Sequence, residues 1–169
     1  MAENSQSVTI TATAAGHTEA TAVVDISDDD VAGITISPTA GLTTTEAGGS
    51  ADFNLVLDSQ PTADVTIALT SSDPGEGTPS PASVIFTDAS WSESQTVTVT
   101  GIDDAEVDGP VAYTIVTGAA VSADGQYAGL NPADVGVVNT DDDTIAPTVK
   151  LETGVVPGVG DAWQTVTLD

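Results

Sequence analysis

The chain of 169 residues contains no cysteine, so no disulfide can stabilise the fold and no thiolate can bind zinc. It has almost no basic residues, because Lys150 is the only lysine and arginine is absent, against 26 Asp and Glu. With a formal net charge of -25 the surface repels phosphate, which excludes nucleic acid and anionic membranes as partners. No apolar run of about 18 residues occurs, and residues 1–6 lack the features of a signal peptide. We therefore expect an excised or mature portion of a longer protein.

Aromatic residues are scarce as well, at 4%, although 40% of the residues are hydrophobic. Val, Ile, Ala and Leu with abundant Thr favour strands. Alternation with period two predicts seven of them, at residues 33–37, 50–57, 64–70, 83–87, 94–101, 111–117 and 134–140. The expected core residues are Phe53, Leu55, Leu57, Ile67, Leu69, Val97, Val99, Tyr113 and Ile115. This spacing predicts an all-β fold, an immunoglobulin-like sandwich of two antiparallel sheets with about seven strands.

Two internal correspondences predict a tandem array. "DISDDDVAGITIS" (25–37) recurs as "VNTDDDTIAPTVKLE" (138–152), so that Asp30 corresponds to Asp143. "AENSQSVTITATAAG" (2–16) matches "VDGPVAYTIVTGAA" (107–120), with Glu3 on Asp108, and residues 122–134 are an insertion in the second copy. We expect residues 1–30 to be the C-terminal part of a preceding β-module, 31–143 a complete sandwich, and 144–169 the N-terminal part of a following module.

About half of the acidic residues collect in loops that a sandwich can bring to one end. Calcium takes six to eight oxygen ligands from carboxylates, carbonyls and water, so a convergent set of acidic loops suits it. Magnesium keeps more of its own water, and zinc prefers His or Cys, of which the chain has only His17. The acidic residues in these loops are Glu46, Asp73, Asp103, Asp104, Glu106, Asp108, Asp141, Asp142 and Asp143.

Residues 31–143 resemble the Calx-beta modules, which were first described in sodium/calcium exchangers and are common in large bacterial surface proteins. The resemblance rests on "TEAGGSADFNLVL", "VTVTGIDDAEVDG" and "NTDDD". It implies that the nine acidic residues named above ligate a small calcium cluster. Asp28, Asp29 and Asp30 form an equivalent triplet, but the acidic loop that should partner them precedes Met1. We therefore expect the second triplet to bind calcium tightly and the first weakly or not at all.

Other interpretations of the acidic residues have less support. A solvated linker would explain an aspartate run alone, but not the other acidic loops. Halophilic adaptation predicts acids on strand faces, whereas "VTIALT" and "QTVTVT" carry none. Paired acids such as Asp103 and Asp104 can hydrolyse glycosides, but that reaction needs an apolar, concave site. His17 has no recognisable nucleophile near it in the sequence, so we expect no enzyme.

The leading hypothesis is a secreted or cell-surface calcium-binding structural module of an adhesin-like or matrix repeat protein. Its partners would be neighbouring modules of the same protein or identical subunits, without membrane insertion. The alternative is a subunit of an extracellular filament that assembles head to tail by strand exchange between the terminal partial modules. A carbohydrate-binding module using Trp91 or Trp163 is a third hypothesis, although a Trp at the entry to a strand more often covers the end of a sandwich.

Overall fold

The computed structural model describes residues 6–27 and 29–145, and in these ranges every regular element is a β-strand. None of the described residues forms a helix that could cross a membrane. The strands are β1 (Gln6–Ala12), β2 (Ala20–Ile26), β3 (Ile34–Ser37), β4 (Leu42–Thr45), β5 (Ser50–Leu57), β6 (Val65–Ser71), β7 (Gly77–Ser80), β8 (Ser83–Phe86), β9 (Gln95–Gly101), β10 (Val111–Thr117), β11 (Val121–Ser122) and β12 (Val135–Thr140).

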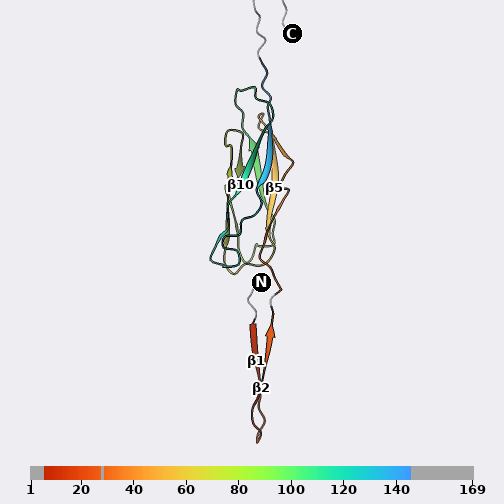
Figure 1. Cartoon of the computed structure of the whole chain (residues 1–169), viewed down its shortest axis with the longest axis vertical. Helices are drawn as coiled ribbons and strands as arrows, with labels where there is room; N and C mark the ends of the chain where they lie inside the picture. The colour runs from red at the N-terminus through yellow and green to blue at the C-terminus, as the bar shows by residue number, and fades with distance from the viewer. Residues whose placement is uncertain (1–5, 28, 146–169) are drawn as a thin grey trace, which may run out of the picture.

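Strands β3 to β12 form two sheets that pack face to face (Figure 1). One sheet has the order β3-β5-β9-β7. The other has the order β11-β6-β10-β12-β4, with β8 also paired to β6. The pairing of β12 with β4 is parallel, and the other pairings are antiparallel. The fold is therefore the immunoglobulin-like two-sheet sandwich that the sequence predicts.

The core lies between the two sheets, where alternate residues of each strand point inward. All nine predicted core residues are buried, with at most 4% of any side chain exposed. Phe53 of β5 lies opposite Val97 of β9, and Tyr113 of β10 lies opposite Val137 of β12. Other large hydrophobic side chains of the core that are fully buried are Val65, Phe86, Tyr127 and Val135. Alternation along the strands was thus sufficient to identify most of the core.

All seven predicted strands are present, with boundaries within one residue of those expected. Within the sandwich, three further short strands, β4, β7 and β11, were not predicted. β4 and β7 are edge strands of four residues, and β7 contains Pro79. Proline is tolerated at an edge because its missing N–H leaves no ladder bond unmade there. Such strands lack the repeated apolar alternation on which the prediction depends.

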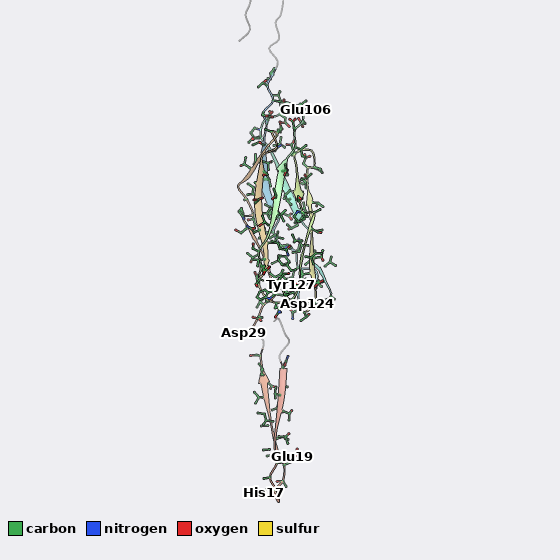
Figure 2. All side chains as sticks on the ribbon, turned by 180° about the vertical axis from the view of Figure 1, so that it is seen from behind. His17, Glu19, Asp29, Glu106, Asp124 and Tyr127 are labelled. Carbon is green, nitrogen blue, oxygen red and sulfur yellow. The ribbon has the colours of Figure 1, made fainter. Side chains whose placement is uncertain are left out.

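Strands β1 and β2 form a separate two-stranded sheet beyond one end of the sandwich (Figure 1). The opposite end carries the loops that follow β4, β9 and β12, and the chain leaves the sandwich there. Asp29 lies between the hairpin and the sandwich (Figure 2). The expected third module falls almost entirely in residues 146–169, outside the described residues.

Candidate metal centre

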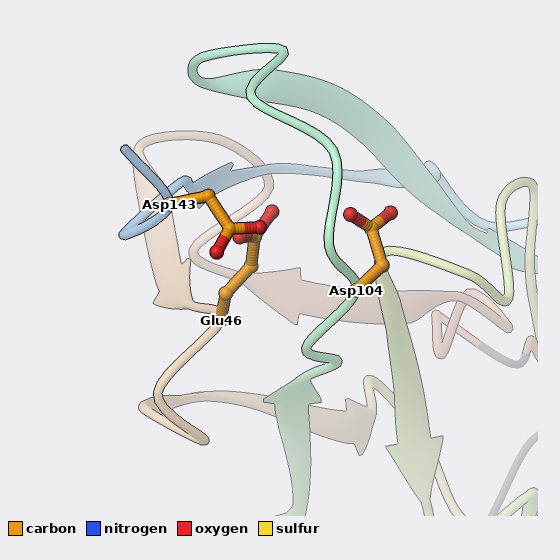
Figure 3. Close-up of side chains that lie close together, drawn as sticks. All are labelled: Glu46, Asp104 and Asp143. Atoms are coloured by element: carbon orange, nitrogen blue, oxygen red, sulfur yellow. The ribbon is translucent and has the colours of Figure 1, made fainter. Parts of the chain in front are cut away.

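Three acidic segments converge at the end of the sandwich that faces away from the hairpin. Glu46 follows β4, Asp103 and Asp104 follow β9, and Asp142 and Asp143 follow β12. Carboxylate oxygens of Glu46, Asp104 and Asp143 lie within 4.8 Å of one another (Figure 3). A second group with the same spacing consists of Glu46, Asp103 and Asp142. Glu46 belongs to both groups, so its carboxylate lies at the centre of the cluster.

The position of Glu46 follows from the parallel pairing of β4 with β12. Thr45 lies opposite Thr140 in this pairing, and the amide of Glu46 donates to the carbonyl of Thr140 at 3.1 Å. The chain then turns back at Gly48, whose φ of 81° is unfavourable for residues with a side chain. The Gly48 amide donates to the Thr45 carbonyl at 3.0 Å, which closes the turn. The glutamate is thereby held beside the start of the aspartate triplet.

Gly101 brings the loop after β9 close to Glu46. Its amide donates to the carbonyl of Gly49 at 3.0 Å. A Cβ atom at this position would collide with the Thr45 carbonyl oxygen and with the side chain of Asn139. Only glycine therefore lets the end of β9 approach so closely that Asp103 and Asp104 face Glu46.

Asp141 orders the third acidic segment. Its Oδ1 accepts a hydrogen bond from the Asp143 amide at 2.7 Å, and its Oδ2 accepts one from the Gly109 amide at 2.7 Å. The first bond shapes the triplet, and the second ties it to the far end of the loop that carries Asp103 and Asp104. Asp141 thus holds two acidic segments together in addition to contributing charge.

Two carboxylate oxygens in the cluster are buried without a hydrogen-bond partner in the protein, Oε2 of Glu46 and Oδ2 of Asp143. Burial raises the pKa of Glu46, and the charges of Asp141, Asp104 and Asp108 raise it further, although a hydrogen bond from the Asp142 amide opposes them. The pKa of Asp143 is also raised, mainly by burial and to a smaller extent by the charges of the neighbouring aspartates. A buried carboxylate is costly unless it is paired or coordinates a metal.

No side chain in the described residues can neutralise this charge by an ion pair. Lys150, the only lysine, lies outside the described residues, and His17 lies at the far tip of the hairpin (Figure 2). Oxygen ligands on converging loops are the donor set of a hard cation such as calcium. The unpartnered oxygens and the donor chemistry therefore both fit a bound cation.

The nine predicted ligands fall into three sets. Five belong to the two groups described above, and Asp141 and Asp108 act on Glu46 through their charges. Asp73 and Glu106 belong to neither group: Asp73 is exposed and accepts from the Gly75 amide at 3.1 Å, and Glu106 is exposed at the tip of its loop (Figure 2). Asp29 and Asp30 of the first triplet are also in neither group. The assignment of all nine as ligands stays a prediction.

A polar network that we did not predict lies directly beneath the cluster. Asn139 is 1% exposed, and its Nδ2 donates to Oε2 of Glu76 at 3.3 Å and to the carbonyl of Ile102 at 3.2 Å. Its Oδ1 accepts from the hydroxyl of Thr44 at 2.9 Å, which is itself 3.1 Å from the hydroxyl of Tyr113. The sequence does contain a signal for it, because Asn139 occupies an inward position of β12, after Val135 and Val137.

Comparisons with known proteins give no close relative. No protein-family model matches the chain, and no curated protein matches it. Among solved structures, the apo form of the Calx CBD1 domain is similar over 65% of this chain and 96% of its own, with 16% identity and a TM-score of 0.49. The periplasmic chaperone SfaE is similar over 68% of this chain and 61% of its own, with 10% identity and a TM-score of 0.49.

A third similar structure is SSP-19, an MSP-domain-like protein of Caenorhabditis elegans. It matches over 63% of this chain and 99% of its own, with 21% identity and a TM-score of 0.45. These similarities are too distant to transfer a function, and the sandwich assignment rests on the two sheets described above.

Proposed function

We propose that this chain contains a non-enzymatic calcium-binding structural module of an extracellular adhesin-like or matrix repeat protein. The observation that carries the proposal is the buried carboxylate of Glu46, whose Oε2 has no hydrogen-bond partner although it lies among the carboxylates of Asp103, Asp104, Asp142 and Asp143. A cation at this position would supply the missing partner. Because Glu46 belongs to both acidic groups, the arrangement suits two ions that share its carboxylate.

The bound cation would act mechanically. The acidic cluster lies where the chain leaves the sandwich, after Asp143, so an ion there would join β4, the loop after β9 and the start of the connection to the next segment. Binding only to the folded state stabilises that state. The same contacts would restrict rotation between the sandwich and the residues that follow it.

The decisive experiment is a calorimetric calcium titration of the whole chain. We expect binding by the wild type, weakened about 100-fold or more in the double variant Asp103→Asn, Asp104→Asn, since calcium affinity depends on the number of charged ligands. The matched control is Asp64→Asn, Asp88→Asn, which removes the same charge from exposed positions outside both acidic groups. No heat from the wild type, or equal affinities in all three proteins, would refute the proposal.

The other two hypotheses receive no comparable support. Trp91 packs half-buried against the hydrophobic core, and its carbonyl accepts from the Leu57 amide at 3.2 Å, as expected for a residue that covers the sandwich end. Trp163 lies outside the described residues. The head-to-tail filament depends on residues 146–169, which also lie outside them, and stays a prediction.

A further inference from the structure

The hairpin of β1 and β2 has one apolar face, and that face is exposed. In its register Val8 lies opposite Val24 and Ile10 opposite Ala22, so these side chains share a face, while Thr9 and Val23 lie on the other. Val8, Ile10 and Val24 are 46%, 56% and 46% exposed. An isolated two-stranded hairpin is marginally stable in water, and its two edges are open to further pairing.

The same chain contains a second hairpin with the same register. Two independent sequence correspondences relate the hairpins: the one that aligns Glu3 with Asp108 covers β1, and the one that aligns Asp30 with Asp143 covers the end of β2. Applied together, they map five of the seven cross-strand pairs of β1–β2, from Gln6–Ile26 to Ile10–Ala22, onto the five cross-strand pairs of β10–β12. The matched pairs are Gln6–Ile26 with Val111–Asn139, Val8–Val24 with Tyr113–Val137, and Ile10–Ala22 with Ile115–Val135.

The sandwich shows how such a hairpin is covered. The face of β10 and β12 that carries Tyr113, Ile115 and Val137 is 0% to 4% exposed, because the sheet β3-β5-β9-β7 packs over it. The edge of β10 that faces away from β12 pairs antiparallel with β6, and the edge of β12 that faces away from β10 pairs parallel with β4. Within the described residues, β1 and β2 form a sheet of two strands and have neither of these edge partners.

We propose that β1–β2 is the closing hairpin of a second sandwich, and that its apolar face and both edges bind a β-sheet unit equivalent to β3–β9 of this chain. This unit is supplied by the polypeptide on the N-terminal side of the hairpin. The connection is direct, because residue 2 corresponds to residue 107, which leads into β10 after the short loop that follows β9. The proposal does not depend on calcium binding by the acidic cluster.

The test is a fusion protein in which residues 31–106 precede residues 2–169, so that strands β3–β9 are offered to the hairpin at the corresponding position. Amide hydrogen exchange of β1 and β2 is measured in the fusion and in the chain alone. We expect near-unprotected exchange in the chain alone and exchange slowed by roughly 100-fold or more in the fusion, since packing converts a fraying element into part of a cooperative unit.

Two variants of the fusion distinguish packing of the apolar face of the hairpin against the added strands from a general effect of introducing a charge. Val24→Asp lies on the apolar face and should abolish the protection, whereas Val23→Asp introduces the same charge on the opposite face and should preserve it. A second fusion carries Val8→Tyr and Ile26→Asn, which restore the residues found at Tyr113 and Asn139, in case the inner surfaces fit poorly.

Three results would overturn the proposal. The first is rapid exchange of β1 and β2 in both fusions. The second is equal loss of protection with Val23→Asp and Val24→Asp. The third is slow exchange in the chain alone that disappears on dilution, because a second copy would then be the occupant.

Discussion

A single buried carboxamide connects the three segments that carry the acidic cluster. Asn139 precedes the aspartate triplet, accepts from Thr44 two residues before Glu46, and donates to the carbonyl of Ile102 immediately before Asp103. It also donates to the buried carboxylate of Glu76. Replacing a residue that holds metal ligands in place by hydrogen bonds typically weakens metal binding by about 10- to 100-fold. Asn139 therefore acts as a positioning residue for the proposed calcium site.

Replacing Asn139 with alanine should weaken calcium binding without removing a ligand. We expect an affinity loss of about 10- to 100-fold. Chemical denaturation should show a loss of stability of about 1 to 3 kcal/mol, because the carbonyl of Ile102 and the buried carboxylate of Glu76 would lose the donor that Asn139 supplies. The matched control is Asn54→Ala, on the exposed face of β5, where the side chain accepts only from Thr96. If folded Asn139→Ala bound calcium with an affinity within twofold of that of the wild type, this role would be contradicted.

At the scale of elements, the inserted loop of residues 122–134 closes the end of the sandwich opposite the acidic cluster (Figure 2). Tyr127 is fully buried, and its hydroxyl donates to the carbonyl of Ser59 at 2.6 Å. Asp124 is 4% exposed and accepts from the amides of Thr62 and Gln126, both at 2.8 Å. The loop therefore fastens the connection between β5 and β6 through two residues of the insertion.

Asp124 gives this loop a defined dependence on pH. Burial alone would raise the pKa of Asp124, but hydrogen bonds from the amides of Thr62, Gln126 and Tyr127 outweigh it, and the pKa lies below its ordinary value. A lowered pKa contributes stability that is complete above the unfolded-state value near 3.8 and is lost as the pH falls through the folded-state value. Asp124→Asn removes this contribution and places an amide group against a backbone N–H.

We expect Asp124→Asn to lower the free energy of unfolding by about 1 to 2 kcal/mol at neutral pH, measured by denaturant titration. The difference from the wild type should shrink as the pH falls below about 4, because the unfolded chain then binds a proton that the folded chain binds only at lower pH. Asp64→Asn, at an exposed position without this network, serves as the control. If the free energy of unfolding of Asp124→Asn stayed below that of the wild type by the same amount down to pH 2, the charge of Asp124 would contribute nothing to stability.

The elements that the sequence predicted are those with repeated alternation, and the ones that it missed depend on contacts distant in the chain. β5 and β10 were predicted to the residue because four successive inward positions are apolar or small. β4 exists because β12 pairs with it, and nothing in "LTTT" signals that partner. Likewise the acidic loops could be assigned to one end, but the central position of Glu46 and the burial of Glu76 follow from the pairing of β4 with β12 and from the close approach at Gly101.

At the scale of the whole molecule, electrostatics opposes the folded state at neutral pH. The chain carries a formal net charge of -25, and self-repulsion of this size destabilises compact states. Exposed carboxylates contribute little to this repulsion, because water and salt screen their charges. The cluster around Glu46 is screened less, since Glu46 is 2% exposed and an oxygen of Asp143 is also buried. A cation bound there would therefore relieve more repulsion than one bound elsewhere on the surface.

The stronger repulsion around Glu46 predicts that the effect of Asp103→Asn, Asp104→Asn on the melting temperature changes sign when calcium is added. In a chelator, Asp103→Asn, Asp104→Asn removes repulsion around Glu46, so the variant should melt at the same temperature as the wild type or higher. With calcium at 100 times the wild-type dissociation constant, the wild type gains about 2.7 kcal/mol per site, which corresponds to a rise in melting temperature of roughly 10 °C. The variant should then melt lower than the wild type.

Thermal melts followed by circular dichroism test this inversion, with sodium chloride at matched ionic strength as the control for screening. Sodium should raise the melting temperatures of both proteins alike, because it screens surface charge without coordinating Glu46. If the double variant melted below the wild type by the same margin in chelator and in calcium, Asp103 and Asp104 would be structural residues of their loop. The acidic end would then owe its stability to hydrogen bonds such as those of Asp141, and a cation would not be required to hold β4, β9 and β12 together.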